Sequence, residues 1–199
     1  KLEMEQSVKK PPKALATKLV HGGTPEPRVD GSVITPIFQT AMFESTGVGD
    51  PRGTRYIRYN NTPNQLALGN ALASLEGAEA ALLFASGLAA ASALFATLPQ
   101  GARVVAPRVM YQGTLSRIKQ MVETGQIDYA LFDATEAGAL ENTVGTAETA
   151  LVWIESPCNP TWDVIDIAAA ARTASFASFV MMSCSSSSLP SSDEVAIAP

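Results

Sequence analysis

An α/β fold with a mostly parallel sheet is predicted by two features of this 199-residue sequence. Short continuous apolar runs alternate with helix-like stretches through most of the chain after residue 63. Runs that are apolar at consecutive positions are typical of strands covered on both faces, as in parallel sheets. Helical stretches between such strands indicate βαβ units. The predicted class is therefore α/β, with helices packed on the faces of the sheet.

The predicted elements follow one another along the chain. A leucine- and alanine-rich helix begins near Asn64 and ends at Gly77, a residue typical of helix C-termini. The patterns after it predict strands at 80–85, 103–106, 129–132, 150–154 and 179–182, and helices at 87–98, 114–123 and 165–173.

Three segments of different character divide the chain. Residues 1–62, dense in proline and glycine, predict an extended N-terminal arm without a core of its own, in which residues 1–3 are interpreted as a cloning remnant. Residues 63–182 predict a partial α/β domain. Residues 183–199 form an atypical serine-rich tail of low complexity. A sheet that ends in such a tail leaves its last strand uncovered, so the sequence predicts a truncated or altered end.

Composition argues against several classes of function. A net charge of −5 without a basic stripe argues against nucleic-acid binding. No apolar run reaches the roughly 20 residues of a membrane span. The two cysteines and the absence of a signal peptide favour a reduced, cytoplasmic location. No His, Cys and carboxylate cluster has the spacing of metal ligands, so no metal site is predicted.

The junction at Ser86 and Gly87 is the first candidate binding feature. A strand that passes straight into a helix presents unpaired backbone N–H groups and the positive end of the helix dipole. Such a notch can hold a phosphate monoester, and glycine lacks the Cβ that would block close approach. The alternative is an ordinary tight turn between a strand and a helix.

Two further candidates follow predicted strands, at the carboxyl ends where ligands bind in open α/β sheets. Tyr111 could stack on a flat heteroaromatic ring and pass a proton through its hydroxyl; the alternative is a half-buried surface tyrosine. Asn159 lies between Pro157 and Pro160, and its amide could donate to a phenolate-like oxygen. The alternative for Asn159 is a turn residue or a helix N-cap.

Tyr56 and Arg58 lie two residues apart near the end of the arm and could reach one anion if that segment is extended. The alternative is a solvated charge in an arginine-rich loop. A cysteine nucleophile is not predicted, because the only histidine, His21, lies in the arm, far in sequence from Cys158. His21 itself is interpreted as structural.

Taken together, these motifs resemble the family of pyridoxal 5′-phosphate (PLP) enzymes that contains cystathionine gamma-synthase, cystathionine gamma-lyase, methionine gamma-lyase and homoserine-ester sulfhydrylases. The resemblance runs from about residue 17 to residue 172 and covers the first half of a usual member. It implies the first part of a fold type I, aspartate-aminotransferase-like large domain. The motifs that carry it are 17–23 (TKLVHGG), 34–40 (ITPIFQT), 56–58, 75–80, 85–87, 111–114 and 155–161.

The resemblance implies a role for each candidate residue. Ser86 with the backbone of Gly87 and Leu88 would hold the phosphate of PLP. Tyr111 would stack on the pyridine ring and assist proton transfer at the substrate. Asn159 would hydrogen-bond the hydroxyl oxygen of the ring.

The resemblance also implies partners and a reaction. Tyr56 and Arg58 would reach the cofactor phosphate of a neighbouring subunit, so the arm would cross between subunits of a homotetramer built as a dimer of dimers. The reaction would be elimination or γ-replacement on a small sulfur amino acid or homoserine derivative, in cystathionine and methionine metabolism.

The sequence departs from the family pattern in three places. Asn61, Thr62 and Pro63 stand where members usually have Asn-Pro-Thr. An aspartate that keeps the pyridine nitrogen protonated is expected where Ser183 or Cys184 stands. No Schiff-base lysine follows Lys119, because the lysines are at positions 1, 9, 10, 13, 18 and 119.

These departures predict that the complete protein is a PLP-dependent carbon–sulfur lyase or transferase and that this polypeptide alone is inactive. One alternative is a non-catalytic relative that associates with full-length subunits. A second is an unrelated α/β protein that binds a small phosphorylated ligand.

Overall fold

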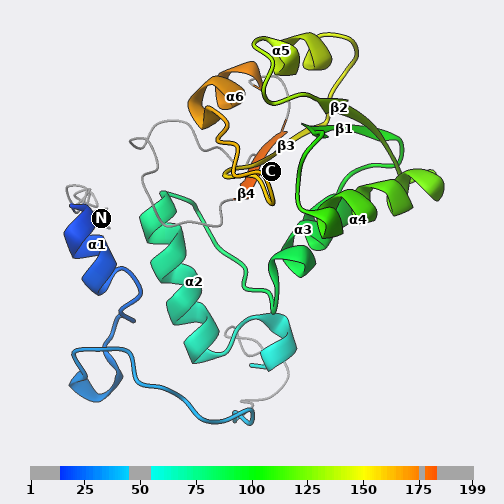
Figure 1. The fold of residues 1–199 in the computed structure, drawn as a ribbon. Coiled ribbons are helices and arrows are strands. Elements are labelled where there is room, and N and C mark those ends of the chain that lie inside the picture. The colour runs from blue at the N-terminus through cyan, green and yellow to red at the C-terminus, as the bar shows by residue number, and fades with distance from the viewer. Residues whose placement is uncertain (1–13, 45–54, 175–177, 183–199) are drawn as a thin grey trace, which may run out of the picture. The chain divides into compact units, whose positions relative to one another are not determined.

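A computed structural model describes residues 14–44, 55–174 and 178–182, the last of these by backbone only. The chain divides into two compact units, one up to Leu83 and one from Phe84 onward (Figure 1). The predicted cloning remnant and the predicted serine-rich tail lie outside the described residues.

The first unit contains helices α1 (Leu15–His21) and α2 (Pro63–Glu76), with short 3-10 turns at Val29–Gly31 and Ile57–Tyr59. The predicted helix that ends at Gly77 is confirmed as α2. Its N-terminus carries a capping box formed by Thr62 and Gln65, and Gly77 ends it in the left-handed conformation with φ of 67°. The short helix α1, which packs against α2, was not predicted within the arm.

The predicted strand at 80–85 is wrong for the described structure. These residues have no helical or strand conformation, and Leu82 and Phe84 are largely exposed. A strand exists only when a neighbour completes its backbone hydrogen bonds, and no described segment pairs with this one. The segment therefore has the apolar composition of a buried strand, but no described strand pairs with it.

The second unit is built around a four-stranded sheet with the order β2-β1-β3-β4, and every adjacent pair of strands is parallel. The predicted α/β class is therefore confirmed, although helix α5 was not predicted. The elements are α3 (Gly87–Ala96), β1 (Ala102–Pro107), α4 (Gln112–Glu123), β2 (Ile127–Phe132), α5 (Ala139–Val144), β3 (Leu151–Glu155), α6 (Ile167–Thr173) and β4 (Ser178–Met182).

Helices cover both faces of this sheet (Figure 1). On one face, α3 and α4 bury a cluster that includes Leu151 and Trp153 of β3, with the Trp153 ring 5.0 Å from that of Phe95. On the other face, α5 and α6 bury a cluster that includes Val152 and Ile154. Because successive strand residues point to opposite faces, β3 is apolar at consecutive positions.

The strand order creates a topological switch point between β1 and β3. The chain leaves β1 through α4, on one face, to reach β2; it leaves β3 through α6, on the opposite face, to reach β4. In open α/β sheets, ligands bind in the crevice that such a divergence opens beyond the carboxyl ends of the strands. The segments that follow β1 and β3 are therefore the first place to look for a site.

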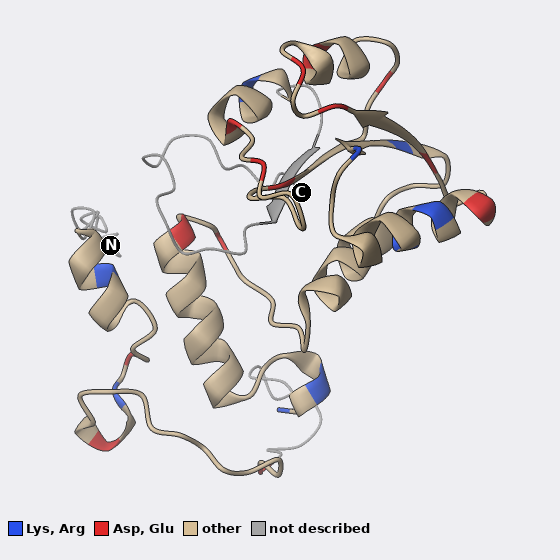
Figure 2. Cartoon of the chain, viewed as in Figure 1, with Lys and Arg blue, Asp and Glu red and all other residues tan. Residues whose placement is uncertain are grey.

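Charged residues form no continuous basic row on the described elements; Figure 2 shows lysine and arginine scattered among acidic residues. Within the described ranges, no helix is long and apolar enough to span a bilayer.

Candidate functional site

The N-terminus of α3 is open to solvent. Ser86 caps the helix, with its Oγ accepting the N–H of Ala89 at 3.1 Å, and no acidic residue lies in the first turn. Ser86 and Gly87 are exposed, and the first-turn amides of Gly87 and Leu88 have no intrahelical acceptor. A short connection, 97–101, returns the chain to β1, so α3 runs back along the sheet. Its N-terminus therefore points toward the carboxyl edge of the strands.

Tyr111 follows β1 at that same edge and is the N-cap residue of α4. Its backbone N–H donates to Oε2 of Glu155 at 2.6 Å. Its ring is 43% exposed and lies over Gly113, where an added Cβ would come within 2.5 Å of the ring carbon Cε1. The absence of a side chain at Gly113 therefore gives the tyrosine ring its present place.

Glu155, the last residue of β3, is a functional candidate that sequence reasoning missed. Its side chain is only 4% exposed, and its Oε1 accepts the indole N–H of Trp153 at 3.1 Å. Burying a carboxylate is costly, and it is tolerated only where its oxygens accept hydrogen bonds. The available signal was a single acidic residue at the end of an otherwise apolar run.

Asn159 lies in the turn that follows β3. Two backbone hydrogen bonds close this turn, from Cys158 to the carbonyl of Asp163 and from Trp162 to the carbonyl of Cys158, both at 2.8 Å. Asn159 is exposed and forms no side-chain hydrogen bond with the described residues, and α6 is capped by Asp166 instead. The side-chain amide of Asn159 therefore neither caps a described helix nor forms a hydrogen bond within the turn.

The segments that follow β1 and β3 are joined by the bond between Tyr111 and Glu155, at the switch point. The turn with Asn159 continues from Glu155, and the sulfur of Cys158 lies 3.2 Å from the Glu155 carbonyl oxygen. Ser86 forms no hydrogen bond with Tyr111 or Asn159. A pocket shared by these residues therefore remains a prediction.

Tyr56 and Arg58 lie in the first unit and contact each other. The Arg58 guanidinium stands 4.6 Å from the centroid of the Tyr56 ring, a cation–π geometry, and the Tyr56 N–H donates to Oδ1 of Asn61 at 2.8 Å. Tyr56 has an extended backbone, and a 3-10 turn covers Ile57–Tyr59, so the pair is not on one extended segment. The turn, rather than an extended strand, brings the two side chains together.

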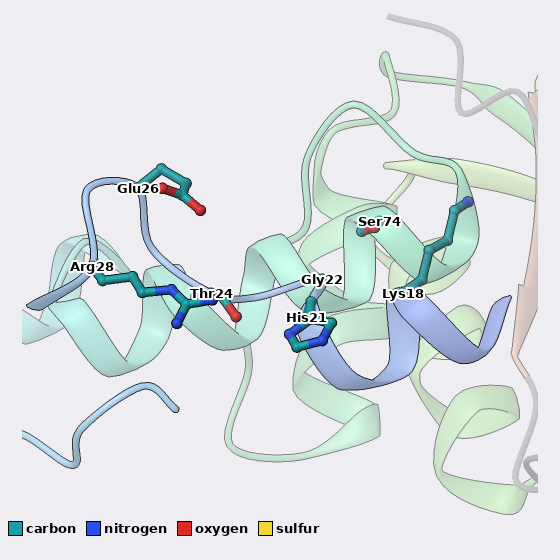
Figure 3. Close-up of a pocket in the computed structure, with 7 residues that line it drawn as sticks. All are labelled: Lys18, His21, Gly22, Thr24, Glu26, Arg28 and Ser74. Atoms are coloured by element: carbon teal, nitrogen blue, oxygen red, sulfur yellow. The ribbon is translucent and has the colours of Figure 1, made fainter. Parts of the chain in front are cut away.

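A hollow of about 460 Å³ in the first unit was not predicted (Figure 3). Lys18 and Arg28 extend from opposite ends of it, and the ring of His21 lies between them. From the sequence, His21 was interpreted as structural. In the structure, it lines this surface hollow. The lining residues are Lys18, His21, Gly22, Thr24, Glu26, Arg28 and Ser74.

Lys119 lies on α4 between β1 and β2, as predicted, and is exposed. Because α4 begins beside the carboxyl edge and runs away from it, Lys119 lies about 10 Å along the helix from that edge. Among the described residues, no group of His, Cys, Asp and Glu could hold a metal ion.

These features define a doubly wound α/β unit with an exposed helix N-terminus and an aromatic residue at its carboxyl edge. Residues 16–185 match the model of the Cys/Met metabolism PLP-dependent enzymes. The chain belongs to this family, whose cofactor is pyridoxal 5′-phosphate. The alternative of an unrelated phosphate-binding protein is thereby excluded.

Three similar proteins illustrate the relationship. A probable cystathionine gamma-synthase of Herpetosiphon aurantiacus is 36% identical over 80% of this chain and 49% of its own length. Human cystathionine gamma-lyase is 36% identical over 76% of this chain and 37% of its own. The crystal structure of Xanthomonas oryzae cystathionine gamma-synthase in complex with cystathionine matches with a TM-score of 0.73 and 28% identity, over 86% of this chain and 44% of that one. The chain thus spans half or less of each relative, and the predicted fold type I architecture is confirmed.

The described residues fit part of PLP. The amides of Gly87 and Leu88, which have no intrahelical acceptor, suit a phosphate monoester, and the ring of Tyr111, an exposed residue, offers a flat apolar face at the same edge. The only lysine of the described second unit is Lys119, which lies away from this edge, so that unit offers no lysine there for covalent attachment.

Cys158 is predicted to react slowly with alkylating reagents. Burial raises the pKa of its thiol, and the negative charges of Asp163 and Glu155 raise this pKa further. The thiolate fraction at neutral pH is therefore below that of a free cysteine, and the alkylation rate should rise only at a more alkaline pH. Iodoacetamide labelling of Cys184→Ser between pH 7 and about 10, followed by mass spectrometry, measures this rate. Labelling at neutral pH as fast as in the urea-unfolded chain would contradict the prediction.

Proposed function

We propose that this chain provides the cofactor-binding half of a PLP-dependent enzyme that catalyses elimination or γ-replacement on sulfur amino acids or homoserine derivatives. The observation that carries the proposal is the hydrogen bond between Tyr111 and Glu155. It joins the loop after β1 to the last residue of β3, at the switch point where ligands bind in such sheets. Family membership supports the cofactor, and the complex of the Xanthomonas relative with cystathionine supports the substrate class.

In this proposal, each candidate residue acts on a different part of the cofactor or substrate. The amides of Gly87 and Leu88 bind the phosphate, and Ser86 holds the first turn of α3 in place through its cap. The Tyr111 ring lies against the pyridine ring, and its hydroxyl moves a proton at the substrate. Asn159 donates its side-chain N–H to the ring oxygen. When bound, PLP supplies the electron sink that weakens bonds at the substrate's α- and β-carbons.

We further propose that Tyr56 and Arg58 bind the cofactor phosphate of a neighbouring subunit, within a cytoplasmic homotetramer. Their contact supports this role, because the cation–π pair restricts the guanidinium to one region beside the phenol ring. A planar guanidinium is suited to bidentate contact with phosphate oxygens. Residues 1–62 then act as an arm that crosses between subunits.

The 199-residue polypeptide alone is proposed to be inactive, because Lys119, the only lysine of the described second unit, lies away from the proposed cofactor. A second candidate function is a non-catalytic subunit that associates with full-length relatives. Four leucines that α2 and its C-terminal connection leave exposed favour this candidate, since a protein contact would bury them. They are Leu66, Leu68, Leu72 and Leu82. Co-purification of a tagged chain with a full-length subunit, lost when these leucines are changed to serine, would support association.

Gly87→Asp tests the phosphate notch. The new carboxylate and Cβ occupy the place of the phosphate. The carboxylate interacts with the positive end of the helix dipole itself and repels the phosphate, so the affinity for PLP should fall by about tenfold or more. The matched control is Gln100→Glu, which adds one negative charge at the exposed loop beyond the other end of α3. Equilibrium dialysis measures both affinities. Equal affinity in Gly87→Asp and the parent would contradict the notch.

Borohydride reduction tests the proposed inactivity. Borohydride reduces the C=N bond between a lysine and PLP to a stable amine, and peptide mass spectrometry then identifies the modified lysine. Only slow, scattered modification of surface lysines is expected, equal to that of the urea-unfolded chain, because Lys119 lies away from the strand edge. Stoichiometric modification of a single lysine would show that the chain has a covalent site and would contradict the proposal.

A further inference from the structure

Glu155 combines features that packing alone does not explain. It is a carboxylate with 4% exposure, and no lysine, arginine or histidine among the described residues forms an ion pair with it. A buried charge without a counter-ion is costly to the fold. Both oxygens nevertheless have assigned partners, since Oε2 accepts the Tyr111 N–H and Oε1 accepts the Trp153 indole N–H.

These two hydrogen bonds connect Glu155 to both helices on one face of the sheet. Through Tyr111 it contacts the start of α4. Through Trp153, whose ring packs 5.0 Å from that of Phe95, it is linked to α3, the helix whose N-terminus forms the proposed phosphate notch. One side chain at the end of β3 thus connects the backbone of Tyr111, through Trp153, to the C-terminal end of α3.

We propose that Glu155 is a positioning residue that sets the place of the Tyr111 ring relative to the α3 notch; its consequence for the cofactor rests on the proposed function above. The backbone N–H of Tyr111 is held from one side by Glu155, and Gly113 leaves room for the ring on the other. With its backbone held by Glu155 and space for its ring over Gly113, Tyr111 is preorganised to stack on a flat ligand, which lowers the entropy cost of binding.

Glu155→Gln is the informative substitution, because it keeps the shape and removes one acceptor. A carboxamide has a single acceptor oxygen, so either the Tyr111 N–H or the Trp153 indole N–H must face a donor. The matched control is Asp133→Asn, which changes another carboxylate at the same strand edge. Asp133 accepts a backbone N–H, that of Thr135 at 3.0 Å, but does not contact Tyr111.

The first readout needs no ligand. The chain has four tyrosines, and 3-fluorotyrosine labelling gives each a ¹⁹F resonance, with that of Tyr111 assigned by Tyr111→Phe. Glu155→Gln should shift or broaden the Tyr111 resonance and leave those of Tyr56 and Tyr59 unchanged, whereas Asp133→Asn should change none of the three. An unmoved Tyr111 resonance in folded Glu155→Gln overturns the proposal.

The second readout uses the parent chain and remains valid if Glu155→Gln does not fold. The amides of Gln112 and Gly113 open helix α4 and have no intrahelical acceptor, whereas that of Tyr111 is held by Glu155. The Tyr111 amide should exchange with deuterium at least about tenfold more slowly than its two neighbours, after correction for intrinsic rates. Equal rates overturn the proposal.

The third readout links positioning to the cofactor. Glu155→Gln should weaken PLP binding by about two- to tenfold, the lower part of the range for residues coupled by contact, and this loss should vanish in a Tyr111→Ala background. A loss of the same size in both backgrounds overturns the proposal, because Glu155 would then act without the ring. If the parent chain does not bind PLP, the proposed function fails, and the ¹⁹F and exchange results still decide the role of Glu155.

Discussion

The structure of the second unit depends on the burial of β3 from both sides. All of its residues, Leu151 to Glu155, are buried, and alternate side chains enter the two hydrophobic clusters. Together with β1, whose Val104 and Val105 also enter the two clusters, β3 separates the layer of α3 and α4 from that of α5 and α6. At about 25 cal/mol per Å² of apolar area, this double burial is the main source of stability at the centre of the sheet.

The same strand places polar groups of the candidate site at the carboxyl edge of the sheet. Its last residue is the only acidic one in the strand, and that residue binds the amide of Tyr111 across the divergence between β1 and β3. The turn with Asn159 begins directly beyond it. A rigid, apolar strand therefore ends in a polar side chain that the core behind it holds in place. A scaffold that positions a site in this way lowers the entropy cost of binding.

The second unit was largely predictable from the sequence, and the first was less so. β1, β2 and β3 were found because each contains a short continuous apolar run, and α2 because Gly77 marks its end. The segment 80–85 has the same apolar character but lacks a paired neighbour, and pairing is a property of the fold that no local pattern contains. Tyr111 and Asn159 were found from their places after strands. Glu155 was missed because its role depends on Tyr111, which is distant in sequence.

The central claim is that the N-terminus of α3 and the segments after β1 and β3 form one binding pocket for PLP. Titration of the ¹⁵N-labelled chain with PLP tests it most directly, because each amide reports separately. The account predicts that the amides of Gly87, Leu88, Tyr111 and Asn159 shift together along a single binding curve. Shifts confined to the hollow around Lys18 and Arg28, or different apparent affinities at α3 and at Tyr111, would contradict it.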